Sequence, residues 1–237
     1  MQGDNHSYSP GNIALVMYQQ PDFTRFCTQD RWRTLGRTVK DVSREDSAQI
    51  FARPSFGKGY TLVDAYDISQ TQGKPIPSTP PLENDSKAME QALTTLLNYA
   101  VVPIVADRSC PVPARYDSQK LELIINPEHD DQTLFASIAT EVAHSRIHAK
   151  GANSAYDRAD CDLDAQSVSY LICRRFGVQR DLPDMKNLSF LYDGWNAPDR
   201  RMALDNIQNM SKQIGGTIER NIIPQTKGRI QTHQAVR

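Results

Sequence analysis

One segment constrains this chain more than any other: residues 135–148, which read FASIATEVAHSRIH. Its apolar side chains recur at intervals of three and four residues, which predicts an amphipathic helix. Thr140, Glu141 and His144 interrupt the apolar face and lie within about one helical turn of each other. Their spacing matches the zinc-peptidase motif H-E-x-x-H, with the first histidine changed to Thr140.

In that motif the two histidines bind zinc, and the glutamate beside the first histidine is the general base. Glu141 then holds the general-base position, His144 is a metal ligand, and Thr140 marks the position of the lost ligand. A threonine hydroxyl is a poor zinc ligand because it stays protonated at neutral pH. We therefore expect either no zinc or weakly bound zinc. The alternative is an ordinary buried helix whose polar groups are satisfied by hydrogen bonds.

A third metal ligand is expected from the next predicted helix, residues 161–176, which follows an acidic start. Many zinc peptidases take this ligand from an acidic residue on the helix after the motif helix. Asp164 is twenty residues beyond His144, so we expect both side chains to face one cleft. The alternative role for these carboxylates is stabilisation of the helix N-terminus. Other candidates to replace the lost ligand are His148, Cys161 and Asp160.

The composition is that of an ordinary globular protein. The 237 residues are 39% hydrophobic and 23% charged, with a net charge of −1, so global charge indicates no partner. The sequence contains no apolar run long enough to span a membrane and no apparent signal peptide, so we expect a cytoplasmic protein that does not bind membranes. The four cysteines are expected to be free thiols.

Hydrophobic periodicity and a proline-rich stretch predict an α+β protein that consists of two modules. In the first, helices are expected at residues 13–18 and 22–35, and a strand pair at 49–53 and 60–68. In the second, strands are expected at 101–106 and 121–125, and helices from 84, over 133–149, over 161–176 and from 199. Gly215-Gly216 is expected to weaken or break the last helix. The predicted boundaries are an N-terminal module 1–75, a proline-rich linker 76–85 that an ordered loop could also explain, a second module 86–217 and a basic tail 218–237.

The N-terminal module carries a local basic cluster with an interleaved aromatic residue. Basic side chains follow a phosphate backbone, and exposed aromatic rings stack on unpaired bases. The cluster therefore predicts binding of single-stranded DNA, and the alternative is a solvated helix face with core aromatics. Its members are Arg31, Trp32, Arg33, Arg37 and Lys40.

Several segments together resemble the ArdC-type antirestriction proteins and their LtrC-like relatives. YSPGNIALVMYQQP, RWRTLGRTVK and DAYDISQTQGKP are similar to the N-terminal domain of that family, and TEVAHSRIH, DAQSVSYLICRRFG and SFLYDGW are similar to its second domain. The resemblance covers roughly residues 7–215. It implies an N-terminal single-stranded DNA-binding domain followed by a zincin-like metallopeptidase domain.

The resemblance places the metal positions on Thr140, His144 and Asp164, and the general base on Glu141. The departures from the family pattern cluster in this site, which predicts a degenerate and inactive peptidase domain. The implied function is that of a bacterial mobile-element protein, antirestriction-like or conjugation-associated, that binds single-stranded DNA. The alternatives are an active zinc metallopeptidase with a rearranged ligand set, and a protein–protein module of a conjugation apparatus with a protein partner.

Overall fold

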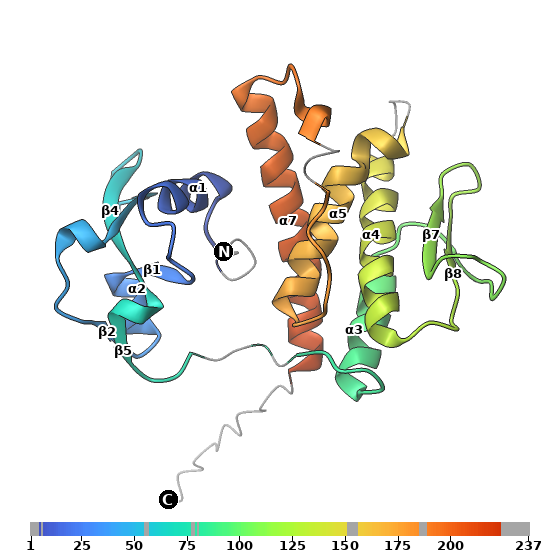
Figure 1. Ribbon diagram of the computed structural model, residues 1–237, viewed down its shortest axis with the longest axis horizontal. Coiled ribbons are helices and arrows are strands. Elements are labelled where there is room, and N and C mark those ends of the chain that lie inside the picture. The colour runs from blue at the N-terminus through green and yellow to red at the C-terminus, as the bar shows by residue number, and fades with distance from the viewer. Residues whose placement is uncertain are drawn as a thin grey trace, which may run out of the picture.

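The computed structural model contains two units, joined by the segment after residue 73 and contacting each other through α1 and α7 (Figure 1). It describes residue 5 and residues 7–54, 57–76, 79, 81–150, 156–184 and 189–223. The fold is α+β, as the sequence predicts. No helix within these ranges is both long enough and apolar enough to cross a membrane.

The N-terminal unit is a small curled sheet with helices on its flanks. A three-stranded antiparallel sheet has the order β1-β4-β3, and a second sheet pairs β2 with β5. Its elements are α1 (Pro10–Gln19), β1 (Phe26–Thr28), α2 (Gln29–Thr34), β2 (Arg37–Val39), η1 (Arg44–Asp46), β3 (Ala48–Ala52), β4 (Thr61–Asp67), η2 (Ile68–Gln70) and β5 (Thr71–Gly73).

The predicted helix at 22–35 is wrong in its first half. Phe26 to Thr28 pair with β4 as strand β1, and Thr28 then caps the short helix α2 by accepting a hydrogen bond from the Arg31 amide. Strand pairing and burial of Phe26 override a helical pattern here. The β3–β4 pair itself is as predicted, although Leu62, expected to be buried, is exposed.

The second unit packs four long helices beside a three-stranded sheet of order β6-β8-β7 (Figure 1). β8 pairs in parallel with β6 and antiparallel with β7. Its elements are α3 (Lys87–Leu97), β6 (Ile104–Ala106), β7 (Ala114–Asp117), β8 (Glu122–Ile125), α4 (Asp131–Lys150), α5 (Arg158–Arg175), η3 (Ser189–Tyr192) and α7 (Ala197–Ile222).

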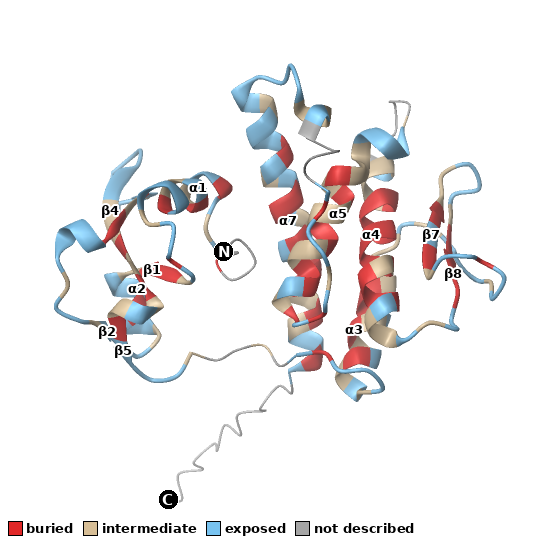
Figure 2. Cartoon of the chain, viewed as in Figure 1, coloured by how far each residue is buried: buried red, intermediate tan, exposed pale blue. Residues whose placement is uncertain are grey.

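The predicted motif helix is α4, and it forms the centre of the second core. It contacts the sheet on one side and α3 and α5 on others, and buried residues run along its length (Figure 2). Phe135, Ile138 and Val142 are all almost fully buried, as their spacing predicts. Such a helix has little free surface, so its polar residues must find partners inside the protein.

Two predictions for the second unit are wrong. The sequence predicts a buried strand at β6, but all three of its residues are exposed, because it lies at the edge of the sheet. The expected break at Gly215-Gly216 is absent, and α7 runs through both glycines to Ile222. A Cβ at Gly215 would lie 3.0 Å from Nη1 of Arg175, so this glycine leaves room for the Arg175 side chain against α7.

The predicted linker is partly packed against the second unit. Leu82 is fully buried, and its amide donates to the carbonyl of Phe176 at 2.9 Å. Residues 77, 78 and 80 lie outside the described ranges, as do residues 224–237 of the predicted basic tail. Residues 218–222, also assigned to that tail, belong to α7. The three predicted boundaries between the segments otherwise stay predictions.

Candidate functional site

His144 lies at the centre of the α4–α5 interface and is fully buried. Its Nε2 is 3.2 Å from Oδ1 of Asp162, and its Nδ1 is 2.8 Å from the hydroxyl of Tyr156. An ionised carboxylate only accepts, so Nε2 carries the proton and Nδ1 accepts from the tyrosine. Burial lowers the pKa of His144, and the nearby Arg158 charge adds to this, against the opposite effects of Glu141 and Asp162. The ring is therefore held neutral, with both nitrogens engaged.

Glu141, the predicted general base, is bound by a guanidinium. Nη1 and Nη2 of Arg158 donate to its two carboxylate oxygens at 2.8 and 2.7 Å. The backbone N–H of Tyr116, on β7, donates to the same carboxylate at 2.7 Å. The hydrogen bond to Glu141 raises the pKa of Arg158. Because the carboxylate is buried and accepts three hydrogen bonds, it is not free to take a proton from water.

Thr140 and His148, the neighbouring motif positions, are also engaged. The Thr140 hydroxyl donates to the carbonyl of Ala136 at 3.3 Å, one turn earlier in the same helix. Nδ1 of His148 is 2.7 Å from the hydroxyl of Tyr116. The imidazole of His148 also stacks on Tyr156, with ring centroids 4.5 Å apart. Both residues therefore serve the packing of the α4 surface.

The sequence predicts that His144 and Asp164 face one cleft, but the two side chains have different partners in the structure. Asp162 is the partner of His144, and residues two apart on a helix point about 200° apart. Asp164 instead accepts a hydrogen bond from the hydroxyl of Tyr192, and burial raises the pKa of its carboxyl. It lines a cavity of 730 Å³ that also includes Arg146 and Met210.

The residues around His144 do not fit a metal ion. Both imidazole nitrogens, both Glu141 oxygens and the Thr140 hydroxyl are already bonded to protein groups. Across the described ranges, no group of three or more histidine, cysteine, aspartate or glutamate residues could hold a metal. Asp160 is exposed, and burial together with nearby carboxylates raises the pKa of the Cys161 thiol, which opposes ligation by the thiolate.

The five residues predicted to bind nucleic acid differ in how accessible they are. Trp32 is fully buried, and its indole N–H donates to the carbonyl of Tyr66 at 2.9 Å, so it cannot stack on a base. The guanidinium of Arg37 donates to Thr71 and Lys74 within the domain, and Lys40 donates to the Ser69 carbonyl. Arg31 and Arg33 are exposed, and Arg33 pairs with Asp30 at 3.2 Å. Trp32 is thus excluded from base stacking, whereas Arg31, Arg33 and Lys40 remain exposed.

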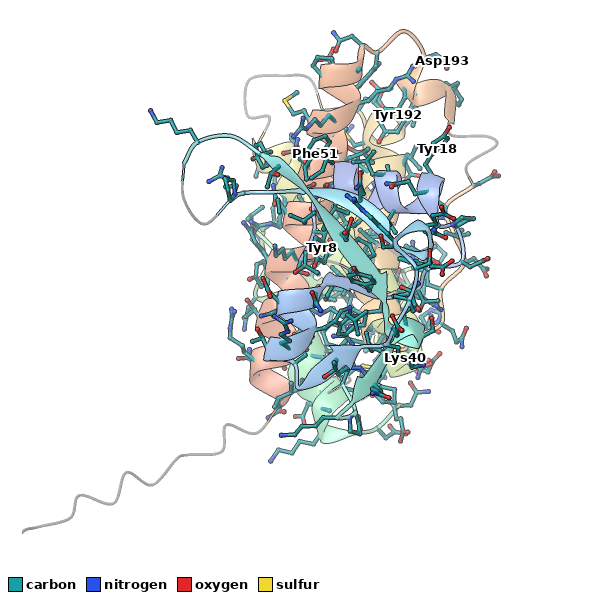
Figure 3. The ribbon with its side chains drawn as sticks, turned by 90° about the vertical axis from the view of Figure 1, so that its left-hand side faces the viewer. Tyr8, Tyr18, Lys40, Phe51, Tyr192 and Asp193 are labelled. Carbon is teal, nitrogen blue, oxygen red and sulfur yellow. The ribbon has the colours of Figure 1, made fainter. Side chains whose placement is uncertain are left out.

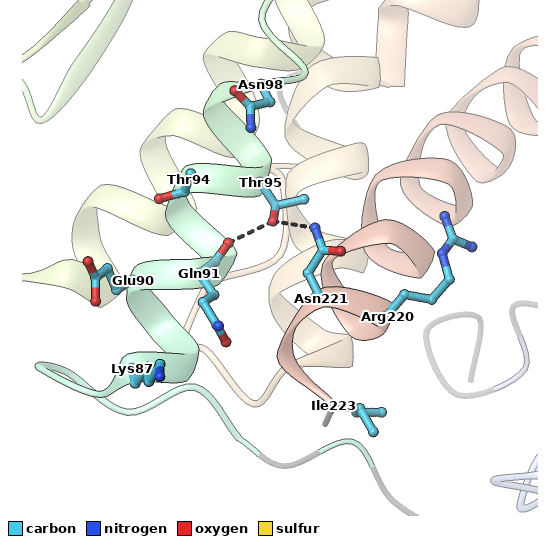
Figure 4. A pocket seen from close by; sticks show the side chains of 9 residues that line it. All are labelled: Lys87, Glu90, Gln91, Thr94, Thr95, Asn98, Arg220, Asn221 and Ile223. Carbon is cyan, nitrogen blue, oxygen red and sulfur yellow. Dashed lines mark hydrogen bonds between the residues drawn. The ribbon is translucent and has the colours of Figure 1, made fainter. Parts of the chain in front are cut away.

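A separate cavity of 710 Å³ lies between α3 and α7 (Figure 4). Neither this cavity nor the one beside Asp164 is lined by Glu141 or His144. In the cavity between α3 and α7, Asn221 donates to the Thr95 hydroxyl, which itself donates to the Gln91 carbonyl at 2.7 Å. These contacts join the two helices and explain the polar lining. The chemistry that the motif predicts is therefore absent from both cavities.

Sequence reasoning missed three residues that complete the site, Arg158, Tyr156 and Tyr116, and considered the fourth, Asp162, only as part of an acidic run. Arg158 and Asp162 are one turn apart on α5, and Glu141 and His144 are about one turn apart on α4. The two pairs have matching spacing on consecutive helices, and each cationic or imidazole side chain has a carboxylate in the other pair. This pattern could have predicted the contacts between them. Tyr116 and Tyr156 carried no signal, since they come from a strand and from the segment before α5.

This arrangement of a curled N-terminal sheet followed by a helical unit is a fold shared with a solved ArdC antirestriction protein. The crystal structure of the antirestriction protein ArdC from the R388 plasmid, bound to Mn(II), matches with a TM-score of 0.52 and 13% identity. That match covers 92% of this chain and 90% of ArdC. The metal-free ArdC structure matches with a TM-score of 0.51 and 12% identity over 91% and 85% of the two chains. No protein-family profile and no curated protein sequence matches.

Proposed function

We propose that this chain is an antirestriction-like or conjugation-associated protein of a mobile element, in which the zincin-like domain does not hydrolyse peptides. The observation that carries the proposal is the bidentate ion pair between Arg158 and Glu141. A working site needs a metal-activated water and a carboxylate free to take its proton. Here a fixed protein cation occupies that carboxylate, and Thr140 replaces a ligand.

A hydrolysis assay tests this proposal directly. A denatured, fluorescently labelled protein substrate is incubated with the purified chain and added Zn(II) or Mn(II). We expect no turnover above that of Glu141→Gln. Turnover that requires both the metal and Glu141 would contradict the proposal and favour the alternative, an active peptidase with a rearranged ligand set.

We further propose that the N-terminal unit binds single-stranded DNA. The support is the similarity of fold to an antirestriction protein, whose function concerns DNA, together with the exposed Arg31 and Arg33. Titration of a labelled oligodeoxynucleotide at two salt concentrations tests it, since phosphate contacts weaken steeply with salt. Lack of binding at low salt would instead favour a protein–protein module, for which pull-downs would recover a partner without nucleic acid.

A further inference from the structure

The outer face of the β3–β4 pair exposes large side chains that the core does not use. In the antiparallel register Phe51 lies opposite Leu62, and Ala52 opposite Thr61, which sets Arg53 beside Tyr60 at the open end. Phe51, Tyr60 and Leu62 are 49%, 65% and 51% exposed. The opposite face of the same strands buries Ile50 and Ala65 in the domain core. Figure 3 looks onto this side of the N-terminal unit, where Phe51 is labelled.

Cations accompany the aromatic rings on this face. The guanidinium of Arg53 lies 5.7 Å from the ring centroid of Tyr60, in a cation–π arrangement. Lys58 is exposed in the turn between the strands. Farther along the face Arg44, which is exposed, is 3.7 Å from the half-buried Asp64, and a pair at this distance stabilises little. The Phe51–Tyr60 end thus combines two exposed rings with two cations.

The edge of β3 is closed to another strand. The side-chain amide of Asn12 donates to the Phe51 carbonyl and accepts from the Phe51 amide, at 2.8 and 2.9 Å. Gln19 makes the same pair of hydrogen bonds with Gln49, at 2.9 and 2.9 Å. A protein partner therefore cannot add a strand at these positions, since the backbone groups that it would pair with are occupied.

We infer that this face is the surface on which single-stranded DNA is bound, with bases stacked on Phe51 and Tyr60 and phosphates held by Arg53 and Lys58. This deepens the proposed function and rests on it. Flat aromatic rings beside a guanidinium suit unpaired bases of any sequence, because every base has a π-face. Phe51 and Tyr60 take the base-stacking role that the sequence predicts for Trp32, which is buried. Binding is expected to have little sequence preference and strong salt dependence.

The test is a fluorescence-anisotropy titration of a labelled thymine oligodeoxynucleotide with the full chain. Tyr60→Leu removes the ring and keeps an apolar side chain, and it should raise the Kd about tenfold, while Tyr60→Phe should change it little. Phe51→Leu should act like Tyr60→Leu. Phe190→Leu is the matched control, since Phe190 is a ring in the other unit whose exposure, 60%, lies between those of Phe51 and Tyr60. Circular dichroism of each variant checks that the fold is kept.

Charge variants supply the second measurement. Arg53→Gln with Lys58→Gln should lower the slope of log Kd against log salt by about 0.7 for each phosphate that is no longer neutralised, and Arg108→Gln should not. If the unmodified chain binds but these variants bind equally well, this inference fails while the proposed DNA binding stands. If the unmodified chain does not bind at low salt, both fail.

Discussion

The ion pair between Arg158 and Glu141 should stabilise the second unit measurably. Arg158→Ala leaves the buried carboxylate with one hydrogen-bond donor, the Tyr116 amide. The side chain of Glu141 is 6% exposed and that of Arg158 is 44% exposed. Breaking the pair should therefore lower the free energy of unfolding by about 2 kcal/mol. This lies between the loss of at most ~1 kcal/mol for an exposed ion pair and ~3–5 kcal/mol for a fully buried one.

Urea denaturation followed by far-UV circular dichroism, which reports mainly on α3 to α7, measures this loss. With a slope of roughly 3 kcal/mol/M, the midpoint should fall by about 0.7 M. Arg158→Lys keeps the charge without the two parallel hydrogen bonds and should lose about half as much. In a double-mutant cycle with Glu141→Gln, a coupling below about 0.5 kcal/mol would refute the reasoning.

Individual contacts support three further predictions. The lowered pKa of His144 means that the unfolded chain binds more protons below pH 6.5, so stability should fall as pH decreases through that value. The urea midpoints at pH 7.5 and 5.5 should therefore differ less in His144→Gln than in the unmodified chain. An equal difference in both proteins would exclude His144 as the cause. Asn12→Ala with Gln19→Ala should expose the backbone groups at the edge of β3 and promote self-association, which sedimentation velocity measures. If the double variant stays monomeric up to high concentration, this edge needs no protection. Gly215→Leu should lower the melting temperature by several degrees, because the new side chain forces Arg175 away. Gly216→Leu is the control, since its side chain meets open space and should not lower the melting temperature. Similar effects at both positions would contradict the packing role of Gly215.

Much of the second unit was predictable because its helices are long and strongly periodic. The β3–β4 pair was predictable because a glycine-containing turn separates two β-rich runs. Strand β1 was not, since its conformation depends on pairing with β4, which lies about forty residues later. The burial of Trp32 likewise depends on a partner, Tyr66, that no local pattern reveals.

At the candidate site, the positions of Glu141 and His144 on one helix surface followed from spacing alone. The partner of His144 did not follow, because the rotation of α5 decides whether Asp162 or Asp164 faces it. Spacing along the chain placed both within reach, and only packing of the two helices distinguishes them. The same rotation brings Arg158 onto Glu141, so an internal cation holds the carboxylate at the predicted general-base position.

We propose that the guanidinium of Arg158 holds Glu141 in place of a metal-activated water. Zinc and manganese content, measured by mass spectrometry after purification without chelator and dialysis, tests it most directly. We expect far less than one equivalent in the unmodified chain, weak binding in Thr140→His, and tighter binding when Arg158→Ala is added. One tightly held equivalent in the unmodified chain, unaffected by either substitution, would contradict the claim.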